Sequence, residues 1–207
     1  MAMRNSDTDF FGKQEGERIL YVIKPHPLSL IIKLAKVCLI AIAVLVTLVV
    51  LGLELGLQGI FLPLGLIIFV SILIVGTKVM TDYQNRDIAY ITDRRMMRFE
   101  PTTLFATNPR SLTWDEVVKV KTYPQNAIWK ELAVGNVILH ARTPTRQFEQ
   151  ETKGFYTVTA DDIELKDVYY YKDLGNYIDE ILFTYKKMPK EMTVIKPFVA
   201  KPKGQRY

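Results

Sequence analysis

The chain has 207 residues, which suits either one ordinary soluble domain or a membrane anchor with a small domain. Its net charge of +5 comes from the tail Lys186–Tyr207, where seven basic residues stand against one acidic residue, so we expect no nucleic-acid-binding fold. The single cysteine, Cys38, excludes an internal disulfide and a multi-cysteine metal site. The apolar residues are concentrated between Leu28 and Met80.

The first apolar run, Leu28–Leu53, follows a polar or mixed segment of 27 residues that we expect to be cytoplasmic. Its only charges, Lys33 and Lys36, stand near its start, where they can extend to the headgroups. At about 1.5 Å per residue, the run is long enough to cross a hydrocarbon core of about 30 Å. A cleaved signal peptide is disfavoured, because no small-x-small cleavage pattern follows and a second apolar run comes at once.

The second apolar run, Gly59–Met80, is uncharged until Lys78. Pro63 falls in its first turn, where the missing N–H breaks no helical hydrogen bond. The connection of roughly Glu54–Gln58 allows only a tight turn, so residues 28–80 are predicted to form a transmembrane hairpin of antiparallel helices. Two long uncharged runs disfavour a buried hairpin in a soluble protein.

Two glycines near the end of the first run allow alternative interpretations. Gly52 and Gly56 have the small-xxx-small spacing that lets membrane helices approach closely. They can equally serve the turn, together with Gly59. The sequence leaves both roles open.

The orientation of the hairpin is predicted from its flanking charges. The connection between the runs contains no Lys or Arg, whereas both outer flanks are basic. The positive-inside rule then places both termini in the cytoplasm and makes the chain a multi-pass protein of the cell (inner) membrane. The flanking residues are Arg18, Lys24, Lys33 and Lys36 on one side, and Lys78, Arg86, Arg94, Arg95 and Arg98 on the other.

Residues 81–187 are predicted to form a cytoplasmic, mostly β domain. From Asp87 onward apolar residues alternate with polar ones, which is typical of half-buried strands. Residues 92–95 between the first two strands indicate a turn. Several short strands with turn residues between them favour an antiparallel sandwich or barrel over about Asp87–Val168. The expected strands are Ile88–Thr92, Met96–Phe99, Ser111–Trp114, Val117–Thr122, Asn136–Arg142, Phe155–Ala160 and Ile163–Val168.

The segment Tyr171–Lys187 is predicted to be an amphipathic helix. Its apolar residues recur at helical spacing on one stripe, which is expected to be buried, and acidic residues lie off that stripe. Lys186 and Lys187 stand at the C-terminal end, where they interact favourably with the helix dipole. The stripe consists of Leu174, Tyr177, Ile178, Ile181, Leu182 and Tyr185.

Several short motifs resemble the bacterial PH-domain family of small membrane proteins, in which two transmembrane helices are followed by a pleckstrin-homology (PH)-like domain. The resemblance covers roughly Gly16–Lys187 and implies an α+β fold: a PH-like antiparallel sandwich or barrel, capped by one C-terminal amphipathic helix. Between Thr143 and Lys153 the chain is longer and more polar than the family pattern. A function taken from the family is fold-level analogy. The motifs are Gly16–Leu20, Lys24–Pro27, Tyr90–Arg95, Leu112–Val117 and Gly135–Leu139.

Eukaryotic relatives often bind phosphoinositides through basic residues of the first strands, so the resemblance points to lipid contacts near the turn at residues 92–95. Plain attraction to anionic lipid would suffice for arginines this close to the membrane. The interpretation that we favour is a tight turn whose arginines face solvent or the nearby headgroups. Candidate contacts to lipid headgroups are Lys78, Arg86, Arg94, Arg95 and Arg98.

The sequence carries no constellation of catalytic residues. It contains no phosphate-binding glycine-rich motif and no G-x-S-x-G motif. His26 and His140 are far apart and lack partners at metal-ligand spacing, and His140 is interpreted as a surface or edge residue of a strand. No charge stands in mid-membrane, which argues against an ion path. We therefore expect a non-enzymatic protein with no cofactor and no metal.

The tail, residues 188–207, is interrupted by Pro189, Pro197 and Pro202, so it cannot be one continuous helix. Its apolar residues predict an extended docking arm for a protein partner, because a purely solvated tail would rarely keep them. The alternative is a basic tail that rests on anionic headgroups. We therefore expect a membrane-anchored scaffold that binds protein subunits or self-assembles, with a lipid-binding or lipid-sensing adaptor as the alternative. The docking residues are Met192, Val194, Ile195, Phe198 and Val199.

Overall fold

The structure is a computed structural model that describes residues 9–103, 105–142, 151–153, 156–158 and 162–200. The chain divides into two compact units. One unit consists of His26–Arg86 with Pro101–Ala106, and the other contains the strands and the C-terminal elements.

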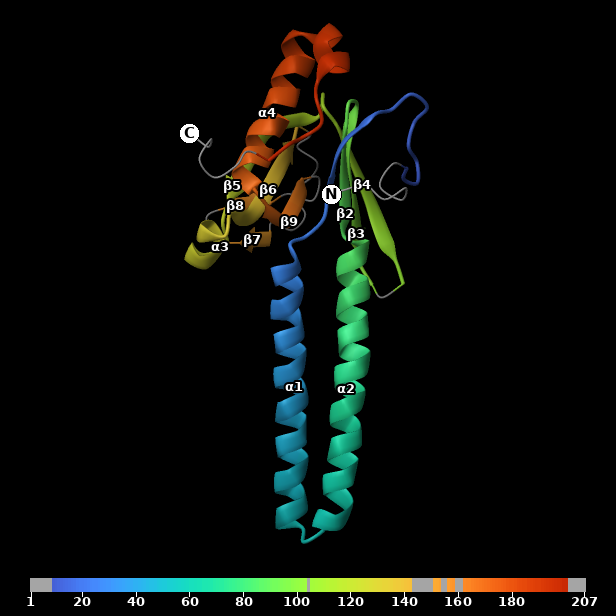
Figure 1. Cartoon of the computed structure of the whole chain (residues 1–207), viewed down its shortest axis with the longest axis vertical. Coiled ribbons are helices and arrows are strands. Elements are labelled where there is room, and N and C mark those ends of the chain that lie inside the picture. Colours follow the sequence, from blue (N-terminus) through green and yellow to red (C-terminus); the bar gives the residue numbers. More distant parts are fainter. Residues whose placement is uncertain (1–8, 104, 143–150, 154–155, 159–161, 201–207) are drawn as a thin grey trace. The chain divides into compact units, whose positions relative to one another are not determined.

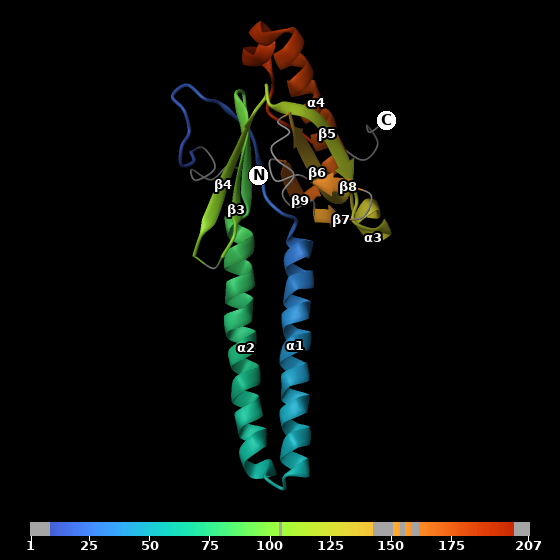
Figure 2. The ribbon, with the colours of Figure 1, turned by 180° about the vertical axis from the view of Figure 1, so that it is seen from behind.

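The first unit contains α1 (Pro27–Glu54) and α2 (Gln58–Arg86), which lie side by side and antiparallel (Figures 1 and 2). His26 caps α1, because its Nδ1 accepts a hydrogen bond from the backbone N of Leu28 at 3.1 Å. Both helices are long and apolar enough to cross a membrane, with mean hydropathy of 2.9 and 2.7 over their most apolar stretches. Each helix extends beyond the run predicted for it, α2 by six residues to Arg86.

Glycines bring the two helices close together. A Cβ atom on Gly76 would lie 2.5 Å from Cγ1 of Val37, and one on Gly52 would lie 2.7 Å from Cβ of Phe61. Gly56 instead has a φ of +66° and open space around it, so it serves the turn. Gly52 therefore allows close packing of the helices, whereas Gly56 serves the turn.

The second unit contains a four-stranded antiparallel sheet in the order β1-β2-β3-β4. Its first strand was not predicted from the sequence. Ile23 of β1 lies opposite Ala89 of β2, so the helical hairpin is inserted in the chain between two neighbouring strands. The predicted turn between β2 and β3 is confirmed, but β4 begins four residues earlier than expected. The bounds are β1 Ile19–Ile23, β2 Ile88–Thr92, β3 Arg95–Pro101 and β4 Thr107–Thr113.

A three-stranded antiparallel sheet in the order β5-β6-β9 follows. The short helix α3 (Ala127–Glu131) was not predicted; Asn126 caps it by accepting a hydrogen bond from Trp129 N at 2.9 Å. Within the segment where we expected the strand Phe155–Ala160, the described strand is β8, and it pairs with the unpredicted β7. The bounds are β5 Val117–Tyr123, β6 Val134–Ala141, β7 Glu151–Lys153, β8 Tyr156–Val158 and β9 Ile163–Tyr169.

One hydrophobic core joins both sheets to helix α4 (Tyr171–Lys187), which has the bounds predicted from its apolar stripe. Trp114 is fully buried in this core and donates its indole N–H to the carbonyl of Thr92 at 3.1 Å. Gly135 and Gly175 allow close contacts at Tyr171 and Thr122, respectively. The predicted α+β arrangement of antiparallel sheets with a helix is thus observed. The core residues contributed by α4 are Tyr171, Leu174, Ile178, Ile181 and Leu182.

The tail begins with a short 3₁₀ helix, η2 (Pro189–Val194), and continues to residue 200 without regular structure. Figure 1 shows this segment returning beside α4. Pro189 occupies the first turn of η2, where a missing N–H costs nothing. The expectation of an extended tail therefore applies only after Val194.

Candidate partner-binding surface

The tail is held against its own domain by hydrogen bonds. Arg18 donates from Nη2 to the carbonyls of Met192 at 3.1 Å and Ile195 at 3.2 Å. The Tyr177 hydroxyl donates to the carbonyl of Lys196 at 2.8 Å. The backbone N of Phe198 donates to the carbonyl of Leu20 at 3.4 Å, so the tail covers part of the β1 edge that would otherwise invite another strand.

The Phe198 ring strengthens this attachment. Its centroid lies 4.7 Å from that of Tyr21 and 5.3 Å from that of Tyr177. Aromatic pairs at these separations contribute beyond the area they bury. The tail after η2 is therefore fixed by a ring between β1 and α4 as well as by its backbone.

The five predicted docking residues separate into two groups. Met192 is buried in the core, and Ile195 and Phe198 are packed against the core. The side chains of these three residues therefore make their contacts within the chain itself. Val194 and Val199 are 72% and 80% exposed. Of the five predicted docking residues, these two valines are the ones that the fold leaves exposed.

A groove of about 620 Å³ lies between α4 and the tail. One wall is a face of α4 and the other is the tail from Glu191 to Val199. Its apolar lining includes both exposed valines. Its charged lining is Asp173, Glu180, Glu191 and Lys196.

Tyr177 sits at the base of this arrangement and stays protonated. Burial raises the pKa of Tyr177 to about 12, with a further rise from Glu180 and a smaller opposing effect of Arg18. The hydroxyl is therefore a permanent donor near neutral pH. It keeps its hydrogen bond to Lys196 and so holds one wall of the groove to the other.

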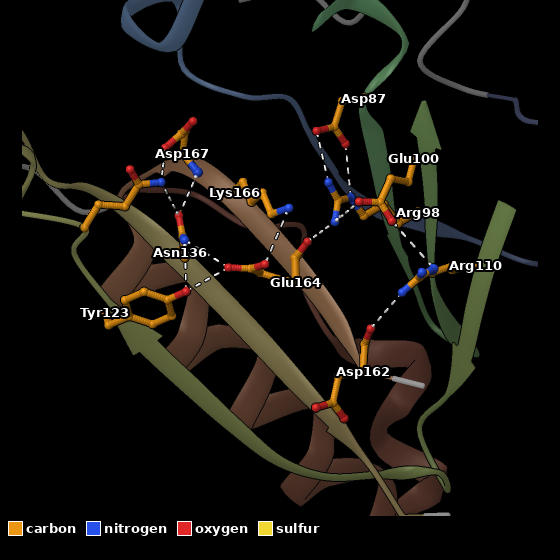
Figure 3. Close-up of polar contacts among 11 residues, drawn as sticks. Asp87, Arg98, Glu100, Arg110, Tyr123, Asn136, Asp162, Glu164, Lys166 and Asp167 are labelled. Carbon is orange, nitrogen blue, oxygen red and sulfur yellow. Dashed lines mark hydrogen bonds and ion pairs between the residues drawn. The ribbon is translucent and has the colours of Figure 1, made fainter. Parts of the chain in front are cut away.

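The basic residues predicted to contact lipid lie in different environments. Arg98 is buried and forms a bidentate pair with Asp87, with Nε to Oδ1 and Nη2 to Oδ2 both at 3.0 Å (Figure 3). Its Nη1 also donates to the carbonyl of Glu164 and lies 3.6 Å from Glu100. Arg98 therefore links β3 to β9 at a buried residue of that strand, and its side chain lies in the interior.

Arg95 also forms an ion pair within the chain, with Glu17. Its Nε lies 3.0 Å from Oε1 of Glu17, and the two side chains are 14% and 0% exposed. The Thr92 hydroxyl donates to the same oxygen at 2.8 Å. Arg94 is exposed and donates to the Gln14 side chain at 3.1 Å.

Two of the predicted basic residues belong to α2. Lys78 is exposed in the last turns of this helix, and Arg86 is its final residue. Of the five predicted lipid contacts, Arg95 and Arg98 are thus the two whose position is defined by the ion pairs described above.

A second polar cluster, centred on Glu164, was not foreseen from the sequence. Glu164 Oε1 accepts hydrogen bonds from the Tyr123 hydroxyl at 2.7 Å and the Asn136 amide at 3.1 Å (Figure 3). Asn136 in turn accepts from the backbone N of Asp167 at 3.0 Å. These contacts run across β5, β6 and β9, so the cluster reinforces the three-stranded sheet.

His140 pairs with a buried carboxylate. Its Nδ1 lies 2.9 Å from Oδ2 of Asp162, whose Oδ1 accepts the backbone N of Ala141. This pair joins β6 to the residue that precedes β9. The predicted surface strand residue is partly buried, and a sequence pattern could not pair it with a residue so far along the chain.

Comparisons with known proteins add no assignment. No protein-family model, curated protein or solved structure matches the chain. Within residues that the structure describes, no group of three or more His, Cys, Asp or Glu side chains is placed to hold a metal ion. The α4–tail groove is the candidate site because it combines a defined volume with two exposed apolar side chains.

Proposed function

We propose that this chain is a non-enzymatic, membrane-anchored interaction module that binds a protein partner through the groove between α4 and the tail. The groove carries this proposal, because it combines a defined volume with the two exposed valines, Val194 and Val199. Hollowed surfaces with apolar contacts and a polar rim are typical of peptide-binding sites. A partner chain or a second copy of the protein would supply the occupant.

We further propose that the strand domain is PH-like. The family resemblance implies an antiparallel sandwich or barrel capped by one C-terminal helix, and the two antiparallel sheets of four and three strands followed by α4 support this proposal. In this interpretation the helical hairpin is an insertion between the first two strands, and β7–β8 is an insertion between the last two strands of the second sheet. Both insertions leave the sheet order intact.

The membrane anchor in this proposal is the α1–α2 hairpin, with both termini in the cytoplasm. Only 6% of the most apolar stretch of either helix is buried, which is opposite to the core helix of a soluble protein. The turn around Gly56 lacks Lys and Arg, whereas Lys33, Lys78 and Arg86 lie toward the other end of the hairpin.

The lipid-adaptor alternative has less support. Arg95 and Arg98 are ion-paired with Glu17 and Asp87, and releasing either arginine to a headgroup would leave the buried carboxylate of Glu17 or the partly buried carboxylate of Asp87 without this partner. Non-specific attraction of the remaining basic residues to anionic lipid would assist anchoring. It does not require a lipid-specific site.

Site-specific photo-crosslinking in native membranes tests the proposed function. A photoreactive side chain replaces Val194 or Val199 in the groove, and Val118 or Ile128 as matched positions that are also exposed but lie outside it. We expect a protein adduct of discrete mass from the groove positions and none from the matched positions. Equal crosslinking at all four positions, or none in the groove, would contradict the proposal.

A further inference from the structure

The α4–tail groove carries a charge opposite to that of the chain. Three carboxylates, those of Asp173, Glu180 and Glu191, line it with a single base, Lys196, whereas the whole chain has a net charge of +5. Glu180 lies on α4 and Glu191 on η2, so negative charge stands on both walls. Charges of one sign around a hollowed surface concentrate ligands of the other sign.

The apolar lining narrows the class of cationic ligand. Val194 and Val199 stay 72% and 80% exposed, although both line the groove. A small cation would leave these side chains in water. An anionic headgroup would meet the three carboxylates. A peptide segment with apolar side chains would cover the valines and gain from their burial.

We infer that the groove binds a protein segment that combines Lys or Arg with apolar side chains. This inference rests on the proposed function and names the chemistry of its partner. The basic side chains pair with Glu180 and Glu191 on the two walls, and the apolar side chains cover Val194 and Val199. The Tyr177–Lys196 hydrogen bond keeps the walls in place for such a segment.

Peptide binding to the full chain tests this inference. The chain is reconstituted in nanodiscs of zwitterionic phosphatidylcholine, and fluorescence anisotropy follows a short labelled peptide of Lys, Ala and Val, with empty nanodiscs subtracted. We expect saturable binding that weakens at least about tenfold in Glu180→Lys/Glu191→Lys, because both partner charges are reversed. The double variant Glu15→Lys/Glu131→Lys makes the same charge change at exposed positions outside the groove and should keep the affinity within about twofold.

Two further measurements distinguish an effect of the lost charges on binding from an effect of the substitutions on folding. Glu180→Gln/Glu191→Gln keeps the side-chain shape and should weaken binding in the same direction, and a peptide with Glu in place of Lys should not bind. The inference is overturned if the two Lys double variants bind the peptide equally, or if the acidic peptide binds as well as the basic one. Crosslinking from Val194 and Val199 can also be measured in membranes that contain Glu180→Lys/Glu191→Lys. If it persists there, the groove still binds a protein, but the partner is not basic. Failure of this inference is therefore distinguishable from failure of the proposed function.

Discussion

At the residue scale, the arginines of this chain show that a charge pattern read from sequence does not reveal which charges are paired within the fold. Arg94, Arg95 and Arg98 are close together in sequence and resemble a basic cluster. In the structure Arg95 contacts Glu17 and Arg98 contacts Asp87, and only Arg94 is exposed. Alternation in a strand sends neighbouring side chains to opposite faces. The partners therefore lie on other elements, and no local pattern reveals them.

Glu17→Gln tests the Arg95 pair. Burial opposes ionisation of Glu17, but hydrogen bonds from Arg95, from Gln14 N and from Thr92 outweigh it, so the pKa of Glu17 is lowered below its usual value of 4.5. A carboxyl whose pKa is lowered in the folded state stabilises the fold at pH values above the pKa of the unfolded chain. This contribution is lost as the pH falls through the pKa of the folded state. We expect Glu17→Gln to reduce the free energy of unfolding by about 2–4 kcal/mol at pH 7, measured by thermal unfolding of the full chain in detergent.

The pH dependence and a matched variant complete this test. The difference between Glu17→Gln and the unmodified chain should shrink as the pH falls below 4.5 and through the lowered pKa of Glu17 in the folded state, because the carboxyl then becomes protonated. Glu15→Gln, at an exposed position nearby, should change stability by less than about 0.5 kcal/mol. Equal effects of the two variants at pH 7 would show that the Glu17–Arg95 pair does not hold the N-terminal segment.

At the element scale, helices and strands with a strong internal periodicity could be predicted from the sequence. Elements that depend on pairing between distant segments could not. The stripe of α4 and the alternation of β2, β5, β6 and β9 gave close bounds, because each pattern repeats within one element. Strand β1 was missed because its five residues do not alternate and its partner lies beyond the helical hairpin. The docking residues of the tail were recognised as apolar, but their partners Arg18, Tyr21 and Tyr177 could come only from the fold.

Ile181→Asp tests whether α4 closes the core. Ile181 is fully buried, and an unpaired carboxylate there should cost at least about 4 kcal/mol, a large share of the stability of a domain. We expect loss of the near-ultraviolet circular dichroism of the aromatic core. Phe183→Asp places the same charge on the same helix at a side chain that is 58% exposed, and it should leave the spectrum intact. A well-folded Ile181→Asp chain would refute the packing of α4.

At the scale of the whole molecule, an apolar helical hairpin is inserted in the chain between β1 and β2, and we propose that it anchors the groove at the cytoplasmic face of a membrane. The hairpin was predictable because the length and apolarity of its helices are local properties. The groove was not, because it forms only when the tail returns to α4. The groove belongs wholly to the unit that contains the strands, α4 and the tail.

Cysteine labelling from outside intact cells tests this arrangement most directly. In a Cys38→Ser background, which removes the single native cysteine, Leu55→Cys marks the hairpin turn and Val199→Cys marks the groove; both positions are exposed. We expect a membrane-impermeant maleimide to label Leu55→Cys in intact cells and Val199→Cys only after permeabilisation. Labelling of Val199→Cys in intact cells would contradict the account, since it would place the groove on the outer side of the membrane and reverse the proposed orientation.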